Sequence, residues 1–472
     1  MTRPSIATVA AIIAAFLFTA CTAGPRYMRP EVSVPTAYKE LSPASAGVLQ
    51  PAEPRDQISR DGWWQVFGEA QLNRLEMRLL SGNPALAEAE ARLRQARALV
   101  RQERAGYFPQ VTATADVTRT HGAAGSRAGV ASGALTDYGL SGGASWEPDL
   151  WGRVRQTVAA GTASAQAAAG DLESARLTLS AELAADYFQL RSFDAELALF
   201  DQTIEAYQRA ATLTRNQYDA GIVSRADVEL AETQLASAQA EGIDIRLQRT
   251  QLEHAIAVLT GEAPANLTLA AMPLDGQPPP IAGDVPSRLL ERRPDIAAAE
   301  RRVASANAQI GVASAAFFPS VSLTANGGFQ ATQLAQWLSW PMRVWSVGPA
   351  LAMTLFDAGA RRGAKAQAIA SYDEMVATYR QTVLAAFQDV EDNLAAERLL
   401  TDEAEDQQAA VAAARRSLEI SLNQYRAGLV SYLQVATQQT ALLTNERAAV
   451  SLTGRRFVAA VQLVRALGGG AG

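Results

Sequence analysis

The sequence contains few of the residue types that most often carry enzyme chemistry. It has one cysteine and two histidines among 472 residues. The single cysteine, Cys21, excludes an intramolecular disulfide and a metal cluster held by several thiolates. His121 and His254 lack neighbours at metal-binding spacing, and no phosphate-binding glycine loop, serine-nucleophile motif or zinc-protease motif is present. We therefore expect no enzyme activity, no metal site and no cofactor.

The sequence also lacks clustered positive charge and long hydrophobic runs. The net charge is −6 and no basic block occurs, so nucleic acid is not an expected partner. Arg3 is followed by an apolar run from Ile6 to Phe18, which is too short to cross a bilayer as a helix. A basic residue before such a run is typical of a signal peptide.

Cys21 follows this run directly. The stretch Leu17-Phe18-Thr19-Ala20-Cys21 resembles a bacterial lipobox, with Phe18 where leucine is usual. In a lipobox the cysteine becomes the lipidated first residue of the mature protein, and several acyl chains, palmitate among them, would hold it at a membrane. The alternative is an ordinary signal peptide with an incidental cysteine. Six prolines between residues 22 and 60 then exclude a helix and predict an extended tether.

The chain contains an internal duplication. The nonapeptide NQYDAGIVS (residues 216–224) returns 207 positions later as NQYRAGLVS (residues 423–431). Further landmarks repeat in the same order at offsets of 207 or 210, which excludes chance. They are Asn83-Pro84 with Arg293-Pro294, Tyr107-Phe108-Pro109 with Phe317-Phe318-Pro319, Gly152 with Gly359, and Gly261 with Gly468.

Each half repeats the same order of predicted elements. Alternating apolar and polar residues over 111–118 and 321–326 predict strands with one apolar and one polar face. Return strands follow over 140–146 and 345–355, after a loop over 121–137 in the first half and a loop with Trp337 and Trp340 in the second. Helices are predicted over 84–107, 153–218 and 226–259 in the first half, and over 294–317, 361–425 and 433–467 in the second.

Helix lengths and a heptad seam predict coiled-coil packing. The long helices have about 65 residues and a length of about 100 Å, which the two shorter helices of each half match when stacked end to end. Apolar or small residues recur every seven positions, and an arginine occupies the same step in both halves. The seams are Val228, Leu235, Gly242, Arg249 and Ile256 in the first half, and Val435, Leu442, Ala449, Arg456 and Leu463 in the second. The helices alone would also suit a soluble bundle.

The strands favour a membrane barrel. Four strands form a sheet with two open edges, and in lipid each unpaired backbone group on an edge costs several kcal/mol. Closure removes the edges, but known barrels start at about eight strands. We therefore expect the chain to assemble with copies of itself, three copies giving twelve strands.

Several separated motifs resemble the TolC-like outer-membrane factors of tripartite efflux systems, in particular the lipoproteins that serve resistance-nodulation-division (RND) pumps. They are WWQVF (63–67), LWGR (150–153), LERRPDI (290–296), FFPSV (317–321), LFDAG (355–359) and YRQTVL (379–384). The resemblance covers nearly the whole mature chain. One departure is Glu147-Pro148-Asp149, where proline interrupts the end of the second strand.

The resemblance implies a mixed α and β membrane fold. Four strands from each of three chains form a trimeric 12-stranded outer-membrane β-barrel, continued by a long periplasmic α-helical coiled-coil barrel. The resemblance also implies a passive exit duct for small molecules such as drugs. It implies that the protein is lipid-anchored in the outer membrane of a Gram-negative bacterium. The implied partners are a periplasmic adaptor (membrane fusion) protein and an inner-membrane RND transporter. The alternatives are a duct for polypeptide secretion and, from another class, a soluble periplasmic coiled-coil scaffold.

The repeated nonapeptides lie at the helix ends remote from the strands and are expected to form a gated periplasmic tip. Gly221 and Gly428 suit the left-handed residue that ends each long helix. By position, Asp227 matches the family's acidic tip site, whereas Gln434 takes that place in the second repeat. The candidate gate residues are Asp227, Asp219, Arg225, Arg426, Tyr218 and Tyr425. The arginines are candidates to pair with the aspartates, and the tyrosines to hydrogen-bond across the tip; the alternatives are solvated helix ends and simple packing.

These predictions divide the chain into segments. They are 1–20 signal peptide, 21–60 lipidated cysteine and tether, 61–83 equatorial segment, 84–108 first-repeat helix, 109–150 first barrel hairpin, 151–261 first helical hairpin, 262–293 inter-repeat equatorial segment, 294–318 second-repeat helix, 319–357 second barrel hairpin, 358–468 second helical hairpin and 469–472 C-terminal tail.

Overall fold

Two compact units make up the protein. The computed structural model describes residues 23–35, 37–40, 62–122, 133–281 and 292–469. Unit 1 comprises residues 1–31, 92–168 and 298–379, and unit 2 comprises residues 32–91, 169–297 and 380–472. The predicted signal peptide (1–20) and Cys21 lie outside the described residues. No helix in the described part of the chain has the length and apolar character needed to cross a membrane.

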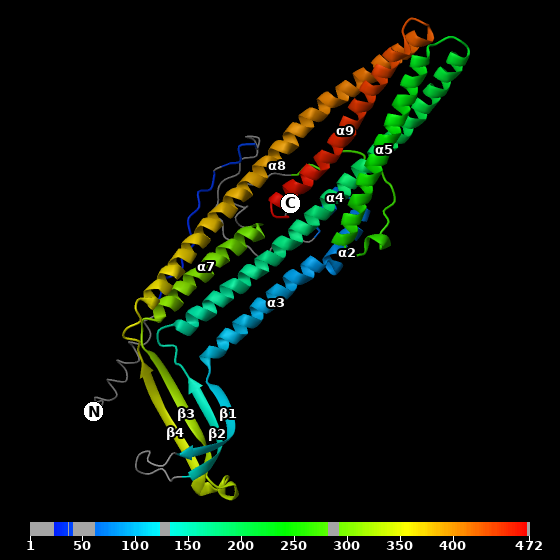
Figure 1. Cartoon of the computed structure of the whole chain (residues 1–472). Coiled ribbons are helices and arrows are strands. Elements are labelled where there is room, and N and C mark those ends of the chain that lie inside the picture. The colour runs from blue at the N-terminus through cyan, green and yellow to red at the C-terminus, as the bar shows by residue number, and fades with distance from the viewer. Residues whose placement is uncertain (1–22, 36, 41–61, 123–132, 282–291, 470–472) are drawn as a thin grey trace. The chain divides into compact units, whose positions relative to one another are not determined.

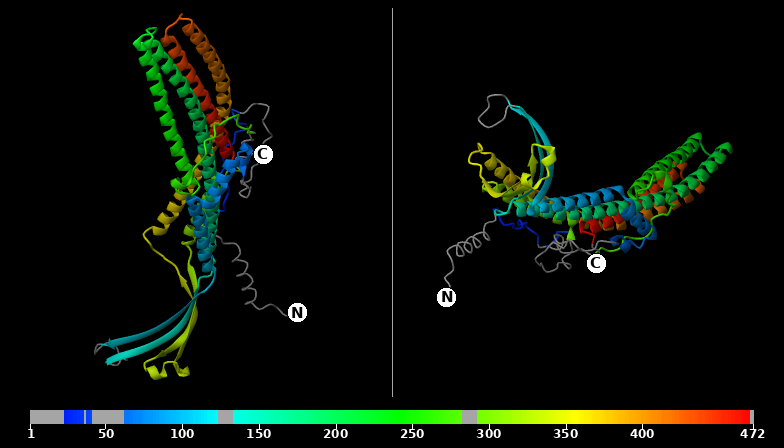
Figure 2. Two further views of the ribbon diagram at one scale, coloured as in Figure 1. Left: turned by 90° about the vertical axis from the view of Figure 1, so that its right-hand side faces the viewer. Right: turned by 90° about the horizontal axis from the view of Figure 1, so that it is seen from below.

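Unit 1 contains an antiparallel sheet of four strands, which confirms the predicted sheet. The strands are β1 (Gln110–Gly122), β2 (Gly133–Trp146), β3 (Ser320–Ala331) and β4 (Arg343–Ala352). They lie side by side in the order β1-β2-β3-β4 (Figure 1), and the sheet curves across its strands (Figure 2). β1 and β4 are therefore the edge strands of the chain.

The strand bounds differ from the predicted ones, and β3 runs to Ala331 rather than ending at residue 326. The first hairpin is longer than expected, because His121 belongs to β1 and residues 133–137 belong to β2 rather than to a loop. Arg119 and His121 interrupt the apolar face, so the sequence pattern stops while the backbone pairing continues. β4 ends at Ala352, which pairs with Ser320 directly after Pro319, so residues 353–355 lie beyond the strand.

The proline-rich segment is extended, as predicted, but it is bound to the helices rather than free. In unit 1 the Ala23 N–H donates to the Trp151 carbonyl oxygen (3.1 Å). Arg29 donates from Nε and Nη2 to the Tyr379 hydroxyl oxygen (3.2 and 3.1 Å). The prolines prevent a helix but leave the other backbone groups and the long side chains able to bond. Residues 23–31 are therefore extended and also hydrogen-bonded to the rest of unit 1.

Unit 2 is mainly helical. The long helices α4 (Arg153–Asp219) and α8 (Ala360–Arg426) each have 67 residues, and α5 (Arg225–Leu259) and α9 (Tyr432–Ala466) each have 35. Within unit 2, α4 with α5 and α8 with α9 form two helical hairpins (Figure 1). Helices α4 and α8 begin in unit 1 and end in unit 2, whereas α3 (Pro84–Arg104) and α7 (Pro294–Ala315) begin in unit 2 and end in unit 1. All these bounds agree with the predicted helices to within three residues.

The heptad seam of α5 is largely buried, as expected. Ala238 and Ile245 pack against Phe200 and Tyr207 of α4 in one apolar cluster. Gly242 lies so close to Phe200 that an added Cβ would be 3.7 Å from its side chain. Small seam residues therefore allow α4 and α5 to approach closely, as coiled-coil packing requires.

Helix α2 (Ala70–Gly82) was not predicted and lies in the segment 61–83. Its buried face is Leu72, Leu75, Glu76 and Leu79, at the spacing of one helix face. Glu76 is fully buried and accepts a hydrogen bond from the Ser180 hydroxyl of α4 (2.7 Å). Burial raises the pKa of Glu76 to about 8, and the Ser180 bond offsets this only in part. Glu76 is therefore mostly protonated in the folded protein near neutral pH.

The repeated landmarks Asn83 and Arg293 each bond to a carbonyl oxygen at the end of a helix, α5 in the first repeat and α9 in the second. Asn83 Nδ2 donates to the Leu259 carbonyl oxygen at the end of α5 (2.8 Å), and Asn83 Oδ1 accepts from the Leu86 N–H of α3 (3.0 Å). In the second repeat, Arg293 Nη1 donates to the Ala466 carbonyl oxygen at the end of α9 (3.3 Å). Each landmark thus satisfies a carbonyl that a helix end would leave unpaired.

A buried ionic cluster joins α4 to α5. Asp194 Oδ2 lies 2.9 Å from Arg191 Nη1, and Asp194 Oδ1 lies 2.7 Å from Arg249 Nε. Arg249 Nη1 also lies 2.7 Å from Glu253 Oε2. The two arginines donate to the carbonyl oxygens of Ala270 and Leu269, so the cluster fixes the segment that follows α5. The seam arginine at 249 is therefore a cross-link between elements.

Candidate functional site

The two nonapeptides form tight turns at the ends of α4 and α8. Gly221 has φ 74° and Gly428 has φ 73°, a left-handed conformation that glycine adopts without steric cost. After α4, the Gly221 N–H donates to the Tyr218 carbonyl oxygen and the next N–H donates to the Gln217 carbonyl oxygen, both at 2.8 Å. The same two bonds, both 2.9 Å, follow α8. Each turn is a Schellman motif, which satisfies the last carbonyls of the helix.

Asp227, the predicted acidic gate residue, is the third residue of α5 and forms a capping box with the N-cap Ser224. Its N–H donates to Ser224 Oγ (3.3 Å), and its Oδ2 accepts from the Ser224 N–H (3.1 Å) and hydroxyl (2.7 Å). A carboxylate in the first turn also interacts favourably with the helix dipole. The equivalent Ser431 makes no side-chain cap bond at the start of α9, where Gln434 replaces the aspartate. The mismatch between the repeats therefore changes how the two helices begin.

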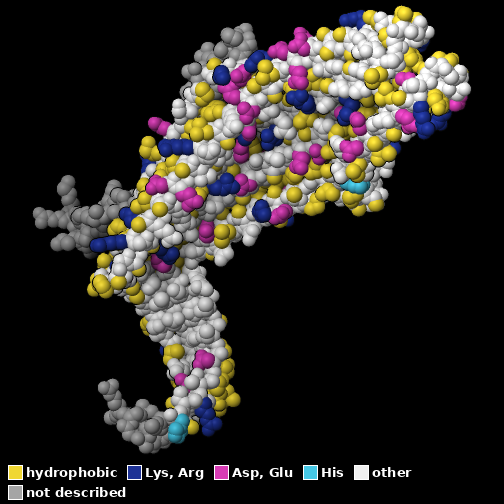
Figure 3. Space-filling view, turned by 45° about the horizontal axis from the view of Figure 1, so that its top comes forward, with side chains coloured by type: hydrophobic (Ala, Val, Ile, Leu, Met, Phe, Trp, Pro, Cys, Tyr) yellow, Lys and Arg dark blue, Asp and Glu magenta, His cyan; other side chains and the backbone are white. Residues whose placement is uncertain are grey.

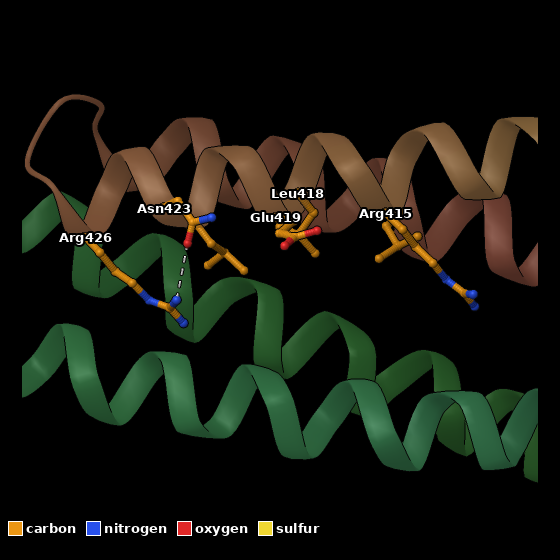
Figure 4. A pocket seen from close by; sticks show the side chains of 7 residues that line it. Arg415, Leu418, Glu419, Asn423 and Arg426 are labelled. Carbon is orange, nitrogen blue, oxygen red and sulfur yellow. Dashed lines mark hydrogen bonds between the residues drawn. The ribbon is translucent and has the colours of Figure 1, made fainter.

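The arginines of the two turns contact residues of their own helices. Arg225 Nε lies 3.2 Å from Glu229 Oε1. Arg426 Nη1 lies 3.5 Å from the amide oxygen of Asn423 (Figure 4). Both contacts join side chains one helical turn apart, which are neighbours on the helix surface. Among the described residues, no ion pair joins Arg225 or Arg426 to Asp219 or Asp227, so the predicted pairing is not found within one chain.

A network of tyrosines and glutamines links the helices behind the turns. The Tyr425 hydroxyl of α8 donates to Gln217 Oε1 of α4 (2.8 Å). The Tyr432 hydroxyl of α9 donates to Gln234 Oε1 of α5 (3.4 Å), and Gln234 Nε2 donates to the Ala436 carbonyl oxygen (2.9 Å). The rings of Tyr425 and Tyr432 meet edge to face, with centroids 5.7 Å apart. The two helical hairpins are thus joined by both hydrogen bonds and ring packing.

Tyr432, which is buried, and Tyr425, which is half-buried, are neutral hydrogen-bond donors near neutral pH. Burial, with a further contribution from the Asp227 carboxylate, raises the pKa of Tyr425. Burial raises the pKa of Tyr432 to about 12. Tyr218, by contrast, is 42% exposed. Sequence analysis missed the role of Gln217, although its place inside a repeated motif was a usable signal.

A groove on α8 and α9 lies beside this network and was also not predicted. Three leucines line it between arginines at either end (Figure 4). Arg415 Nη2 at one end lies 2.7 Å from Glu446 Oε1 of α9, while Arg426 lies at the other. The lining residues are Arg415, Leu418, Glu419, Leu422, Asn423, Arg426 and Leu442.

The sheet of unit 1 has one polar and one apolar face. Side chains of residues paired across strands lie on the same side of a sheet, so the register shows which face each side chain belongs to. One row is Thr112, Gly143, Asn326 and Ser346, and the adjacent row on the other face is Val111, Ala144, Ala325 and Val347. On the polar face the Thr114 and Ser141 hydroxyl oxygens lie 2.8 Å apart, and Gln330 Nε2 donates to Asp137 Oδ2 (2.5 Å). Such a sheet suits a boundary between lipid and water.

His121 and His254 are both exposed. Over the described ranges, no group of three or more histidine, cysteine, aspartate or glutamate side chains is placed to hold a metal ion.

Comparison with known proteins gives consistent results. A family model described as "Outer membrane efflux protein" matches residues 76–262 and 285–469. The toluene efflux pump outer membrane protein TtgC of Pseudomonas putida is 30% identical over 466 residues, covering 97% of this chain and 94% of the relative. Outer membrane protein OprJ of Pseudomonas aeruginosa is 31% identical, covering 100% and 97%. The solved outer-membrane channel OprN is 32% identical with a TM-score of 0.85, covering 95% of this chain and 99% of that one.

Proposed function

This chain belongs to the outer membrane efflux protein family, and from that premise we propose that three copies form the exit duct of a tripartite efflux pump. The duct would passively conduct small toxic molecules to the outside of a Gram-negative cell. The observation that best supports this is a curved sheet with one polar and one apolar face and two edge strands. Polar side chains would line a water-filled path while apolar ones face lipid.

The trimer follows from the edges of the sheet. β1 and β4 end the sheet within one chain, and their outward N–H and C=O groups need partners in lipid. If β4 of one copy pairs with β1 of the next, three copies of four strands give a closed barrel of twelve. The helices that follow would then extend into the periplasm as a coiled-coil barrel.

The partners and cargo are proposed from the same premise. An inner-membrane RND transporter would supply the energy, and a periplasmic adaptor would connect it to the turns that follow α4 and α8. The relative TtgC is named for toluene efflux, which favours small apolar or amphiphilic cargo over polypeptides. Cys21, acylated after removal of residues 1–20, would anchor the chain in the membrane.

The membrane assembly is tested by fractionation and semi-native electrophoresis. The full chain should be recovered from the outer membrane as a trimer. Cys21→Ser should remove the acyl mass from the mature protein while the trimer persists, because barrel insertion alone retains it. A monomer in the soluble periplasm would contradict the duct and favour a coiled-coil scaffold, and an unmodified Cys21 would contradict lipidation alone.

Asp227 is proposed as part of a cation-attracting gate at the turns. Asp227→Asn keeps a capping acceptor but removes the charge, so it should lower cation preference or raise conductance in planar bilayers. Ser224→Ala is the matched control, because it removes the cap bond while keeping the carboxylate. It should cost about 1 kcal/mol of local helix stability with ion selectivity unchanged. Equal selectivity in wild type and Asp227→Asn channels would exclude the gating role.

A further inference from the structure

Two arginines lie on the apolar face of the sheet, near the end that carries the loops between strands. Arg119 of β1 pairs across the sheet with Thr136, two residues beyond Val117 on the same face. Arg343 begins β4 and pairs with Phe329. Asp116 and Asp137 lie on the opposite, polar face, because they alternate with these positions. The sheet therefore separates its charges, with bases on the apolar face and acids on the polar face.

These two arginines differ from those at the helix-bearing end of the sheet. There three arginines are each paired with a nearby carboxylate, at N–O distances of 2.8, 3.1 and 2.5 Å. The pairs are Arg153 with Glu147, Arg155 with Asp149, and Arg361 with Asp357. Arg119 and Arg343 are exposed, and neither has an ion-pair partner among the residues that the structure describes. Their guanidinium groups are thus available to an external anion.

The Trp340 ring contacts Arg343. Its guanidinium carbon lies 4.4 Å from the centroid of the Trp340 ring, a cation–π contact. Trp340 is 72% exposed, and Trp345 on the same face as Arg343 is 75% exposed. A cation–π contact uses none of the guanidinium N–H donors, and a phosphate group can accept two of them. Exposed tryptophans beside arginine are typical of a membrane–water interface.

The depth of these residues follows from the cost of burying charge. A lipid-facing arginine is costly at the middle of a bilayer and nearly neutral at the interface. In the proposed assembly, Arg119 and Arg343 therefore belong at the headgroup level. In the proposed assembly the helices extend into the periplasm, so the helix-bearing end of the sheet meets the inner leaflet of the outer membrane. The loop-bearing end with both arginines then meets the opposite, outer leaflet.

We propose that Arg119 and Arg343 bind the phosphate groups of anionic lipid in the outer leaflet. This inference rests on the proposed function, which makes the apolar face lipid-facing. β1 and β4 are the edge strands, so closure of three copies brings Arg119 of one copy and Arg343 of the next onto adjacent strands. A phosphate-bearing lipid bound there lies at the boundary between copies and strengthens the trimer.

The proposal is tested by native mass spectrometry of full-length trimers titrated with diphosphoryl lipid A or with phosphatidylcholine. Wild type should retain diphosphoryl lipid A preferentially. Arg119→Gln and Arg343→Gln should each weaken its binding about fivefold, and the double variant roughly twentyfold. The control is Arg246→Gln with Arg416→Gln, which removes two exposed charges from α5 and α8 and should leave lipid binding unchanged.

Equal retention of diphosphoryl lipid A by wild type and the double variant would overturn the proposal. A wild-type preference abolished by equimolar inorganic phosphate would also overturn it, because the site would then bind free anions. Semi-native electrophoresis is run on every variant: loss of the wild-type trimer or of membrane insertion contradicts the proposed function, whereas an intact trimer without phosphate preference contradicts only the lipid site.

Discussion

Asp194→Ala is expected to lower the free energy of unfolding by about 3–5 kcal/mol. The Asp194 side chain is fully buried and contacts both Arg191 and Arg249, at 2.9 and 2.7 Å. It also accepts the Met272 N–H (2.9 Å), which holds the segment after α5. Removing this carboxylate leaves Arg191 without its carboxylate partner and Arg249 with Glu253 alone, and an uncompensated buried charge is costly.

The measurement is guanidinium unfolding of the detergent-solubilised protein, followed by far-UV circular dichroism. Asp201→Ala is the matched control, because Asp201 is exposed on the same helix, α4. Its effect should stay within about 0.5 kcal/mol. In an Arg249→Leu background the loss from Asp194→Ala should be smaller, since fewer charges are left unpaired. A loss below about 1 kcal/mol in the wild-type background would show that the cluster is not electrostatically important.

Glu76→Gln is expected to stabilise the protein at alkaline pH. The pKa of Glu76 is raised from 4.5 to about 8 by burial, so the folded state holds a proton that the unfolded state releases. Its stabilising contribution is complete below about pH 4.5 and is lost as pH rises through about 8. The shift corresponds to about 5 kcal/mol between the two limits, as an order of magnitude. Glutamine is neutral at every pH and can still accept the Ser180 hydrogen bond.

The test compares unfolding free energies of wild type and Glu76→Gln across the neutral to alkaline range. Wild-type stability should fall with pH, whereas the variant should be flatter and more stable above about pH 8. Burial, with a contribution from Glu182, raises the pKa of Asp186 to about 6, so the comparison is made above that pH. Glu405→Gln, at an exposed position on α8, should leave the wild-type slope unchanged. If the unfolding free energies of wild type and Glu76→Gln changed with pH in parallel, the titration of Glu76 would be ruled out as the cause.

The helices and the sheet were predictable because their signals are local. Alternation over 111–118 and 321–326 and the long stretches without glycine or proline follow directly from backbone geometry. Duplication doubled each signal, so weak patterns in one half were supported by the other. Helix α2 was missed because thirteen residues are short and Glu76 interrupts its apolar face. Only burial against α4 makes that glutamate part of a core.

The residue types at the turns were predictable, but their contacts were not. Gly221 and Gly428 were assigned correctly, since a Schellman turn depends on the backbone of one helix end. Within one chain, Arg225 and Arg426 each reach a neighbour on their own helix, and their pairing with Asp219 and Asp227 stays a prediction. The bond from Tyr425 to Gln217 joins residues 208 positions apart, and no periodicity in either helix specifies such a partner.

The amino-acid sequence alone thus determined the element order, the duplication, the turn glycines and the family of this protein, since each depends on local pattern or on separated motifs. Tertiary structure decided which face of the sheet each strand residue joins, how the N-terminal segment binds the helices, and where buried charges are compensated. The physical reason is that cross-strand register and burial depend on contacts between distant residues. Arg119 and Arg343 illustrate this: 224 positions apart in the sequence, they are placed on one face only by the pairing of four strands.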